Sequence, residues 1–111
     1  MESKYAKVEG CTSTVEVILM GQAENNITKR IKDFLKSKGV WHVKYFANAF
    51  TSVGIPDILA CVKGHFVGIE VKTDIGRLSE IQKYQAEQLK KSGGSWFCVR
   101  PNNFSDFKQD I

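Results

Sequence analysis

Apolar residues along the chain follow two different periods, which predicts an alternation of helices and strands. From Gly21 to Gly39 they recur every three or four positions, as on one face of an amphipathic helix. This apolar stripe consists of Ile27, Ile31, Phe34 and Leu35. Elsewhere, short apolar and β-branched runs predict strands. We expect these strands at residues 40–46, 55–62, 65–72 and 95–100.

Capping and turn residues complete the predicted order of elements. Ser79 is a favourable N-cap for a second helix that ends near Ser92, with two lysines in its last turn and two glycines beyond it. Lys63-Gly64 predicts a two-residue turn, and a short helix is expected from about Asn103. The order helix, three strands, helix, strand predicts an α/β domain whose mixed central sheet is flanked by helices.

The N-terminal residues do not fit this pattern. The β-branched run 14–20 predicts a short extra strand after a polar arm. We therefore assign residues 1–20 to an N-terminal extension and residues 21–111 to one domain. A length of 111 residues suits a single core. We expect neither a signal peptide nor a membrane-spanning segment.

Charge and cysteine content bear on the partners of the protein and on its cellular compartment. The net charge of +4 and the isoelectric point near 9.0 are compatible with an anionic partner but do not require one. Three cysteines without a C-x-x-C pair argue against disulfides and structural zinc. We therefore expect a reducing compartment, the cytoplasm.

Two acidic residues come together if the predicted turn forms. With Val62 opposite His65, Asp57 lies opposite Glu70 on the neighbouring strand, so their side chains share one face of the sheet. Lys72 lies two positions beyond Glu70 and therefore on the same face. Two carboxylates at such a distance repel each other unless they share a proton or a cation.

A divalent cation would resolve this repulsion, and both acids also adjoin apolar runs where an unpaired charge is costly. Carboxylate oxygens without nearby cysteine or histidine pairs favour Mg²⁺ or Mn²⁺. Lys72 would then bind a phosphate oxygen or orient an attacking water. The alternative is structural, with Asp57 in a turn and Glu70 and Lys72 as a surface pair.

Three further residues have two interpretations each. Glu24 extends the apolar stripe of the first helix, where it either faces a cation or stabilises the positive end of the helix dipole. Gln82 either forms a capping box with Ser79 or directs its amide toward the acidic pair. Lys44 either faces the same site or is solvated.

The sequence resembles the virus-type replication-repair nuclease (VRR-NUC) domain, a branch of the PD-(D/E)xK nuclease superfamily. The resemblance covers roughly residues 21–104 and rests on motifs that occur in order. These motifs are Gly54-Ile55-Pro56-Asp57, Gly68-Ile69-Glu70-Val71-Lys72, Gly76-Arg77-Leu78-Ser79-Glu80-Ile81-Gln82 and Gly93-Gly94. It implies an α-β-β-β-α-β restriction-endonuclease-like core and phosphodiester hydrolysis that depends on Mg²⁺ or Mn²⁺.

The resemblance also assigns roles by position. Asp57, Glu70 and the backbone carbonyl of Val71 would bind the metal, and Lys72 would be the catalytic lysine. Gln82 would be the glutamine beside the site. Glu24 would be the acid of the first helix and completes the expected catalytic set.

The loop after Lys72 departs from the family pattern. Many relatives have Pro-Gly there, whereas this chain has Thr73-Asp74-Ile75-Gly76. The departure leaves open how the loop that faces DNA is held. We assign DNA binding to Lys44, Arg77 and Lys83.

The leading hypothesis is a metal-dependent, structure-specific endodeoxyribonuclease that resembles Holliday-junction resolvases. Compact members of the family are phage or bacterial homodimers that act on branched DNA, so the resemblance implies a bacterial or phage-infected host cell. The alternatives are a non-cleaving nucleic-acid-binding module of the same fold and a nuclease subunit that acts on duplex DNA with a partner. We expect no small-molecule cofactor.

A homodimer is also expected because two symmetric cuts require two acidic clusters. The predicted strand at 14–20 offers an apolar interface to which Trp41, Tyr45 and Phe46 would add aromatic area. The alternative is that residues 14–20 form an edge strand of their own sheet.

Overall fold

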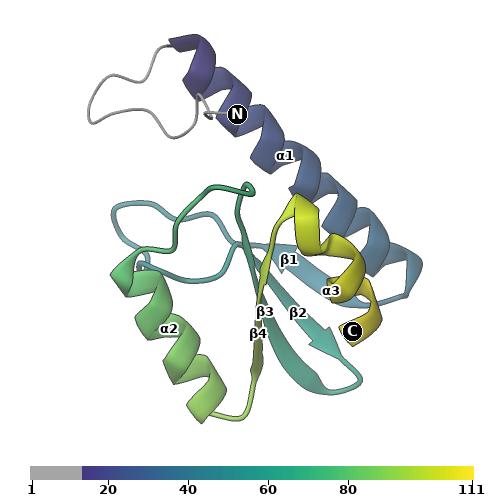
Figure 1. The fold of residues 1–111 in the computed structure, drawn as a ribbon. Coiled ribbons are helices and arrows are strands. Elements are labelled where there is room, and N and C mark those ends of the chain that lie inside the picture. Colours follow the sequence, from purple (N-terminus) through teal and green to yellow (C-terminus); the bar gives the residue numbers. More distant parts are fainter. Residues whose placement is uncertain (1–13) are drawn as a thin grey trace.

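A four-stranded mixed sheet lies at the centre of the structure, a computed structural model that describes the backbone of residues 14–111 and side chains from residue 21 onward (Figure 1). The strands, in spatial order, are β1 (Trp41–Lys44), β2 (Ile58–Val62), β3 (His65–Val71) and β4 (Ser95–Val99). β1, β2 and β3 are antiparallel neighbours, whereas β4 runs parallel to β3. The helices are α1 (Thr14–Ser37), α2 (Glu80–Lys91) and α3 (Phe104–Asp110), with a 3₁₀ turn η1 (Pro101–Asn103) before α3.

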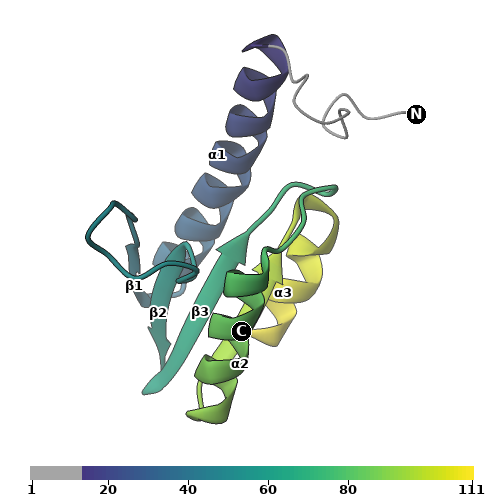
Figure 2. The same ribbon diagram turned by 90° about the vertical axis from the view of Figure 1, so that its left-hand side faces the viewer.

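Helices cover both faces of this sheet (Figures 1 and 2). α1 and α3 pack on one face, where Ile27, Ile31 and Leu35 of the predicted apolar stripe are buried. Phe34 lies at the border of this core and contacts the rings of α3. α2 lies on the other face, where its Leu89 packs directly over Gly68 of β3. The expected α/β domain with a mixed sheet and flanking helices is confirmed.

The hairpin between β2 and β3 has the predicted register. Val62 pairs with His65, and the pairing continues without a bulge to Ile58 and Ile69. Lys63 and Gly64 form the turn with φ angles of 51° and 83°. Positive angles at both central positions match the right-handed twist of the two strands. This turn therefore fixes which residues face each other along the hairpin.

Each predicted strand is shorter in the structure, and β2 loses its first three residues. It begins at Ile58 rather than at residue 55, because Pro56 lacks the N–H that a sheet ladder requires. The segment before it is packed against α2 instead. Gly54 has a φ of 77°, and a Cβ atom there would lie 2.7 Å from the carbonyl oxygen of Ile81.

The predicted strand at 14–20 is wrong, because these residues form the first two turns of α1. β-Branched residues are only slightly worse helix formers than average, and a single glycine costs a helix about 1 kcal/mol. Gly21 therefore does not end the helix. The dimer interface expected from this strand is likewise unsupported. The polar arm at 1–13 lies outside the described residues, and within them no helix has the length and apolar character to cross a membrane.

Replacing Gly21 tests this correction. A Cβ atom at Gly21 would meet nothing within 4 Å. Gly21→Ala should therefore raise the free energy of unfolding by about 0.5–1 kcal/mol, as measured by urea unfolding followed by circular dichroism. Gly39→Ala is the matched control and should destabilise the protein, because Gly39 has a φ of 69° beyond the end of α1. Destabilisation by Gly21→Ala would contradict a continuous helix.

Candidate active site

Asp57 and Glu70 come together at the end of the β2–β3 hairpin. The pair next to Ile58 and Ile69 in this register is Asp57 and Glu70. Oδ2 of Asp57 accepts a hydrogen bond of 2.7 Å from the backbone N–H of Val71. Glu70 is 2% exposed and lies between buried residues, whereas Asp57 is half-buried. The hairpin thus places one buried and one accessible carboxyl group side by side.

The electrostatics of the pair favour a bound proton or cation. The pKa of Glu70 is raised from 4.5 to about 8, most strongly by burial and then by the negative charge of Asp57 and a hydrogen bond with it. The positive charges of Lys72 and Lys44 oppose this shift. Oε1 of Glu70 is buried and accepts no hydrogen bond, and among the described residues no other buried side-chain N or O atom lacks a partner.

Gln82 fulfils both of its predicted roles at once. Its Oε1 accepts a hydrogen bond of 2.9 Å from the backbone N–H of Ser79, while its own backbone N–H donates to Oγ of Ser79 at 3.2 Å. These bonds form the capping box of α2. Its Nε2 donates to Oε2 of Glu70 at 3.1 Å. The start of α2 is therefore tied directly to the buried acid.

Lys44 and Glu24 approach the pair from other elements. Nζ of Lys44 lies 3.8 Å from Oδ1 of Asp57 and donates to the carbonyl oxygen of Tyr45 at 3.2 Å. Glu24 is exposed, yet desolvation by surrounding atoms raises the pKa of its carboxyl, with a smaller upward contribution from Asp57. Lys72 and Lys44 lower the same pKa. These influences place Glu24 near the acidic pair.

The dipole interpretation of Glu24 is wrong. It requires a position in the first turn of a helix, since the effect falls off beyond that turn. α1 begins at Thr14, so Glu24 lies well inside it. Glu24 is exposed, so its expected place on the buried side of α1 is wrong as well. That it faces a cation stays a prediction.

Arg77 and Lys83 lie together at a cavity beside the start of α2. Both are exposed and line a cavity of about 390 Å³ that Arg100 also borders. Lys83 forms an ion pair of 3.0 Å with Glu80. Lys44 is not among the residues of this cavity. The three basic residues assigned to DNA binding therefore belong to two separate surfaces.

Arg100, which is not among the residues predicted from the sequence, holds the loop after Lys72. Its Nη1 donates to the carbonyl oxygens of Thr73 and Gly76, each at 2.6 Å. A further hydrogen bond of 3.0 Å joins Asn102 N–H to Asp74. This chain thus fixes the loop without the Pro-Gly that the resemblance leads one to expect there. A parallel pairing of β3 with β4 could have indicated this role, because it brings the ends of both strands, and hence Arg100 and the loop after Lys72, to one edge of the sheet.

The donor set suits a hard divalent cation. Two carboxylates and the adjacent carbonyl of Val71 offer oxygen ligands, which Mg²⁺ and Mn²⁺ prefer. Oε1 of Glu70 has a free acceptor position, and a cation would offset both the burial and the repulsion from Asp57 that raise its pKa. Within residues 14–111, no group of three or more His, Cys, Asp or Glu side chains is placed to hold a metal. The candidate set therefore depends on the pair, the carbonyl and water.

Comparisons with known proteins give no family for this chain: no family model matches it, and neither does any curated protein or solved structure.

The raised pKa of Glu70 predicts a pH-dependent stability. Between pH 4.5 and about 8, the folded metal-free protein retains a proton that the unfolded chain releases. The free energy of unfolding should therefore be highest below this range and fall as the pH rises through it. Urea unfolding in a chelating buffer measures this dependence. Glu70→Gln should remove it, and a variant that retained the same slope would contradict the assignment to Glu70.

Gln82 variants separate the cap from the contact with Glu70. Gln82→Glu keeps an acceptor for the Ser79 N–H but replaces the amide donor by a negative charge. It should move the pH-dependent loss of stability to higher pH. Gln82→Ala should instead lower stability by about 0.5–2 kcal/mol through loss of the cap. Gln88→Glu, at an exposed position of α2, is the charge control. If Gln82→Glu left the pH dependence of the free energy of unfolding unchanged, only the capping role of Gln82 would be supported.

Proposed function

We propose that this chain is a metal-dependent endonuclease with a core of the PD-(D/E)xK type, similar to the VRR-NUC domain. The observation that carries the proposal is the buried Oε1 of Glu70, which has no hydrogen-bond partner and lies beside a second carboxylate. A binding module has no need for such a pair, since its burial is costly and its charge repels phosphate. A hydrolase that uses a cation does need it.

In this proposal, Asp57, Glu70 and the carbonyl of Val71 hold Mg²⁺ or Mn²⁺. The ion would supply positive charge to the scissile phosphate and lower the pKa of bound water. Asp57 is half-buried and accessible from solvent, whereas Glu70 is enclosed. The Val71 N–H fixes Asp57 through its hydrogen bond to Oδ2. The amide of Gln82 fixes Glu70 in the same way through Oε2.

Lys72 supplies a positive charge beside this pair. Its charge lowers the pKa values of both Glu70 and Glu24, so the ammonium group lies within electrostatic reach of each. Its backbone N–H donates to the carbonyl oxygen of Val99 at 3.1 Å, which anchors it to β4. We assign it to the phosphate or to the attacking water. Glu24 then acts as an outer acid that orients water or Lys72.

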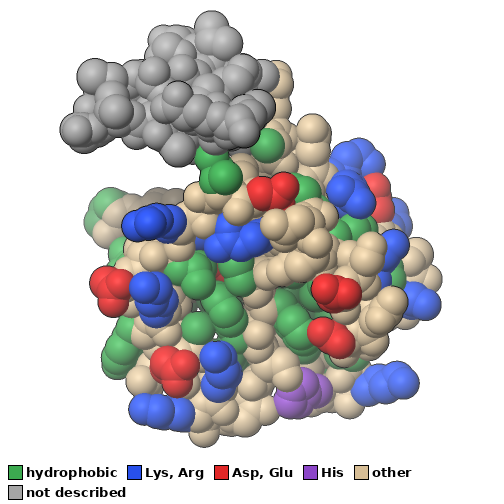
Figure 3. Space-filling model, in the orientation of Figure 1, with side chains coloured by type: hydrophobic (Ala, Val, Ile, Leu, Met, Phe, Trp, Pro, Cys, Tyr) green, Lys and Arg blue, Asp and Glu red, His purple; other side chains and the backbone are tan. Residues whose placement is uncertain are grey.

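The proposed substrate is branched DNA, and the proposed active form is a homodimer. Figure 3 shows basic and acidic side chains interspersed on the visible face, so charge alone does not mark a DNA surface there. One described chain contributes one acidic pair, and cutting two strands symmetrically requires two. Trp41 and Val43 on the edge strand β1 are exposed and offer apolar area to a second copy. Light scattering measures the oligomeric state, and a monomer in solution would contradict the proposed homodimer.

Cleavage assays test the catalytic proposal directly. The purified protein should cut labelled four-way junctions or flaps in Mg²⁺ or Mn²⁺ and not in a chelator. Asp57→Asn and Glu70→Gln should each abolish cleavage and weaken metal binding, because each removes a charged ligand. Lys72→Ala should lower the rate about a hundredfold or more at saturating metal while metal binding persists.

Lys91→Gln is the matched control for loss of a lysine, because Lys91 is exposed in the last turn of α2. It should cleave like the unchanged protein. Full activity of Asp57→Asn and Glu70→Gln would overturn the proposed site. Tight DNA binding without cleavage of any substrate would favour the non-cleaving module.

A further inference from the structure

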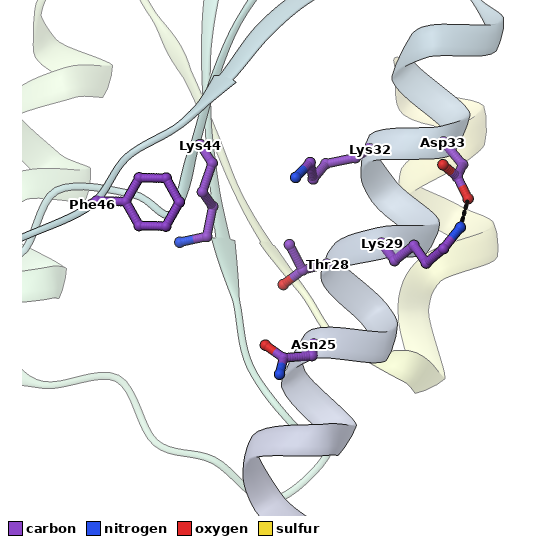
Figure 4. Close-up of a pocket in the computed structure, with 7 residues that line it drawn as sticks. All are labelled: Asn25, Thr28, Lys29, Lys32, Asp33, Lys44 and Phe46. Carbon is purple, nitrogen blue, oxygen red and sulfur yellow. Dashed lines mark hydrogen bonds and ion pairs between the residues drawn. The ribbon is translucent and has the colours of Figure 1, made fainter.

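A groove adjoins the acidic pair on the side of α1. Figure 4 shows Asn25, Thr28 and Lys32 of α1 on one wall, with Lys44 and Phe46 opposite them. The groove has a volume of about 400 Å³. The three residues of α1 are spaced three and four positions apart, so they share one face of the helix. Two lysines from different elements thus face one another across a space open to solvent.

The chemistry of these walls suits phosphate and an aromatic base. Lys32 and Lys44 carry the positive charge, while Asn25 and Thr28 offer neutral hydrogen-bond donors. Lys29 also borders the groove, but Asp33 neutralises it through an ion pair of 2.8 Å. Phe46 is 75% exposed, and Nζ of Lys44 lies 5.1 Å from the centre of its ring. An exposed ring beside a lysine is a site where a base can stack while its phosphate is neutralised.

The loop that carries Phe46 is held so that its aromatic side chains face outward. Asn48 closes a turn by accepting the Phe50 N–H at 2.7 Å. The hydroxyl of Tyr45 donates to the carbonyl oxygen of Ser52 at 3.1 Å. Farther along, Gln85 of α2 donates to the carbonyl oxygen of Val53 at 3.1 Å. Phe50 remains 97% exposed despite these bonds. The loop therefore presents apolar rings to solvent rather than to the core.

Lys44 makes the groove continuous with the candidate active site. Its ammonium lies 3.8 Å from Oδ1 of Asp57 and also borders the groove. A strand whose scissile phosphate lies at the acidic pair would therefore pass Lys44 and enter the groove. A continuous duplex keeps its bases stacked on each other, so Phe46 could contact a base only where the strand is unpaired.

We propose that this groove binds the unpaired strand of a nucleic-acid substrate, with phosphates at Lys32 and Lys44 and a base stacked on Phe46. The inference deepens the proposed nuclease function, because it names the substrate as DNA that contains a single-stranded segment next to the cut. Binding in the groove does not itself require cleavage.

Fluorescence anisotropy without divalent metal tests the groove. The probes are an oligothymidine of about 12 nucleotides, within the site size of one small domain, and a blunt duplex of the same length. The unchanged protein should bind the single strand more tightly. Phe46→Ala should weaken single-strand binding about tenfold and Phe46→Trp should restore it, while duplex binding is unaffected. Lys32→Gln should weaken binding and reduce the salt slope by about 0.7.

Phe66→Ala and Lys91→Gln are the matched controls. Phe66 is an exposed aromatic at the opposite end of β3, and Lys91 is an exposed lysine at the end of α2. Both variants should bind the two probes like the unchanged protein and keep its oligomeric state. Equal affinity for single strand and duplex, or full single-strand binding by Phe46→Ala, would overturn the proposal that the groove binds an unpaired strand.

Cleavage is measured in parallel so that the two proposals can fail separately. Metal-dependent cleavage without a preference for single strands would retain the nuclease and reject the groove. Preferential binding of single strands that Phe46→Ala abolishes, without cleavage of any substrate, would retain the groove and reject the nuclease. Binding of neither probe would reject the groove as a nucleic-acid site.

Discussion

The repulsion between the carboxyl groups of Asp57 and Glu70 is the constraint on which the arrangement of the site depends. A two-residue turn fixes the register of β2 and β3, so the chain cannot place these residues apart without disrupting the hairpin. Burial of Glu70 prevents water from relieving the repulsion. The remaining ways to stabilise the pair are a proton, nearby positive charge, hydrogen-bond donors and a cation. Lys44, Gln82 and the Val71 N–H provide the second and third of these.

The position of α2 follows from the same pair. One side chain, Gln82, both caps the helix and donates to Glu70, so a shift of the helix would break both interactions. Two close approaches keep the helix in place. Gly68 and Gly94 leave room for Leu89, and a Cβ at either position would lie less than 3.0 Å from it. The packing of Leu89 therefore explains why glycine occupies these two positions.

The sequence predicted those parts of the structure that local chemistry determines. The Lys63-Gly64 turn sufficed to place Asp57 opposite Glu70, and Ser79 sufficed to locate the start of α2. The prediction failed at residues 14–20, because β-branched side chains disfavour a helix by too little to decide between helix and strand. Arg100 was missed because its partners in the loop lie 24 and 27 residues away. The groove was missed for the same reason, since only the fold brings Lys32 to face Phe46.

The cost of burying Glu70 is itself an argument about function. A buried polar group without a hydrogen-bond partner costs about 1–3 kcal/mol, and a small domain has a net stability of only about 5–15 kcal/mol. Glutamine at this position would avoid the repulsion, and an apolar residue would extend the neighbouring core. The amide of Gln82 reduces the cost at Oε2 of Glu70, but no donor reaches Oε1. The hydrogen bond between Glu70 and Asp57 forms only while one of the two acids keeps a proton. Folding alone gives no reason for this acid. A cation bound at the pair would offset the cost, because the free energy of metal binding would add to the stability of the folded protein.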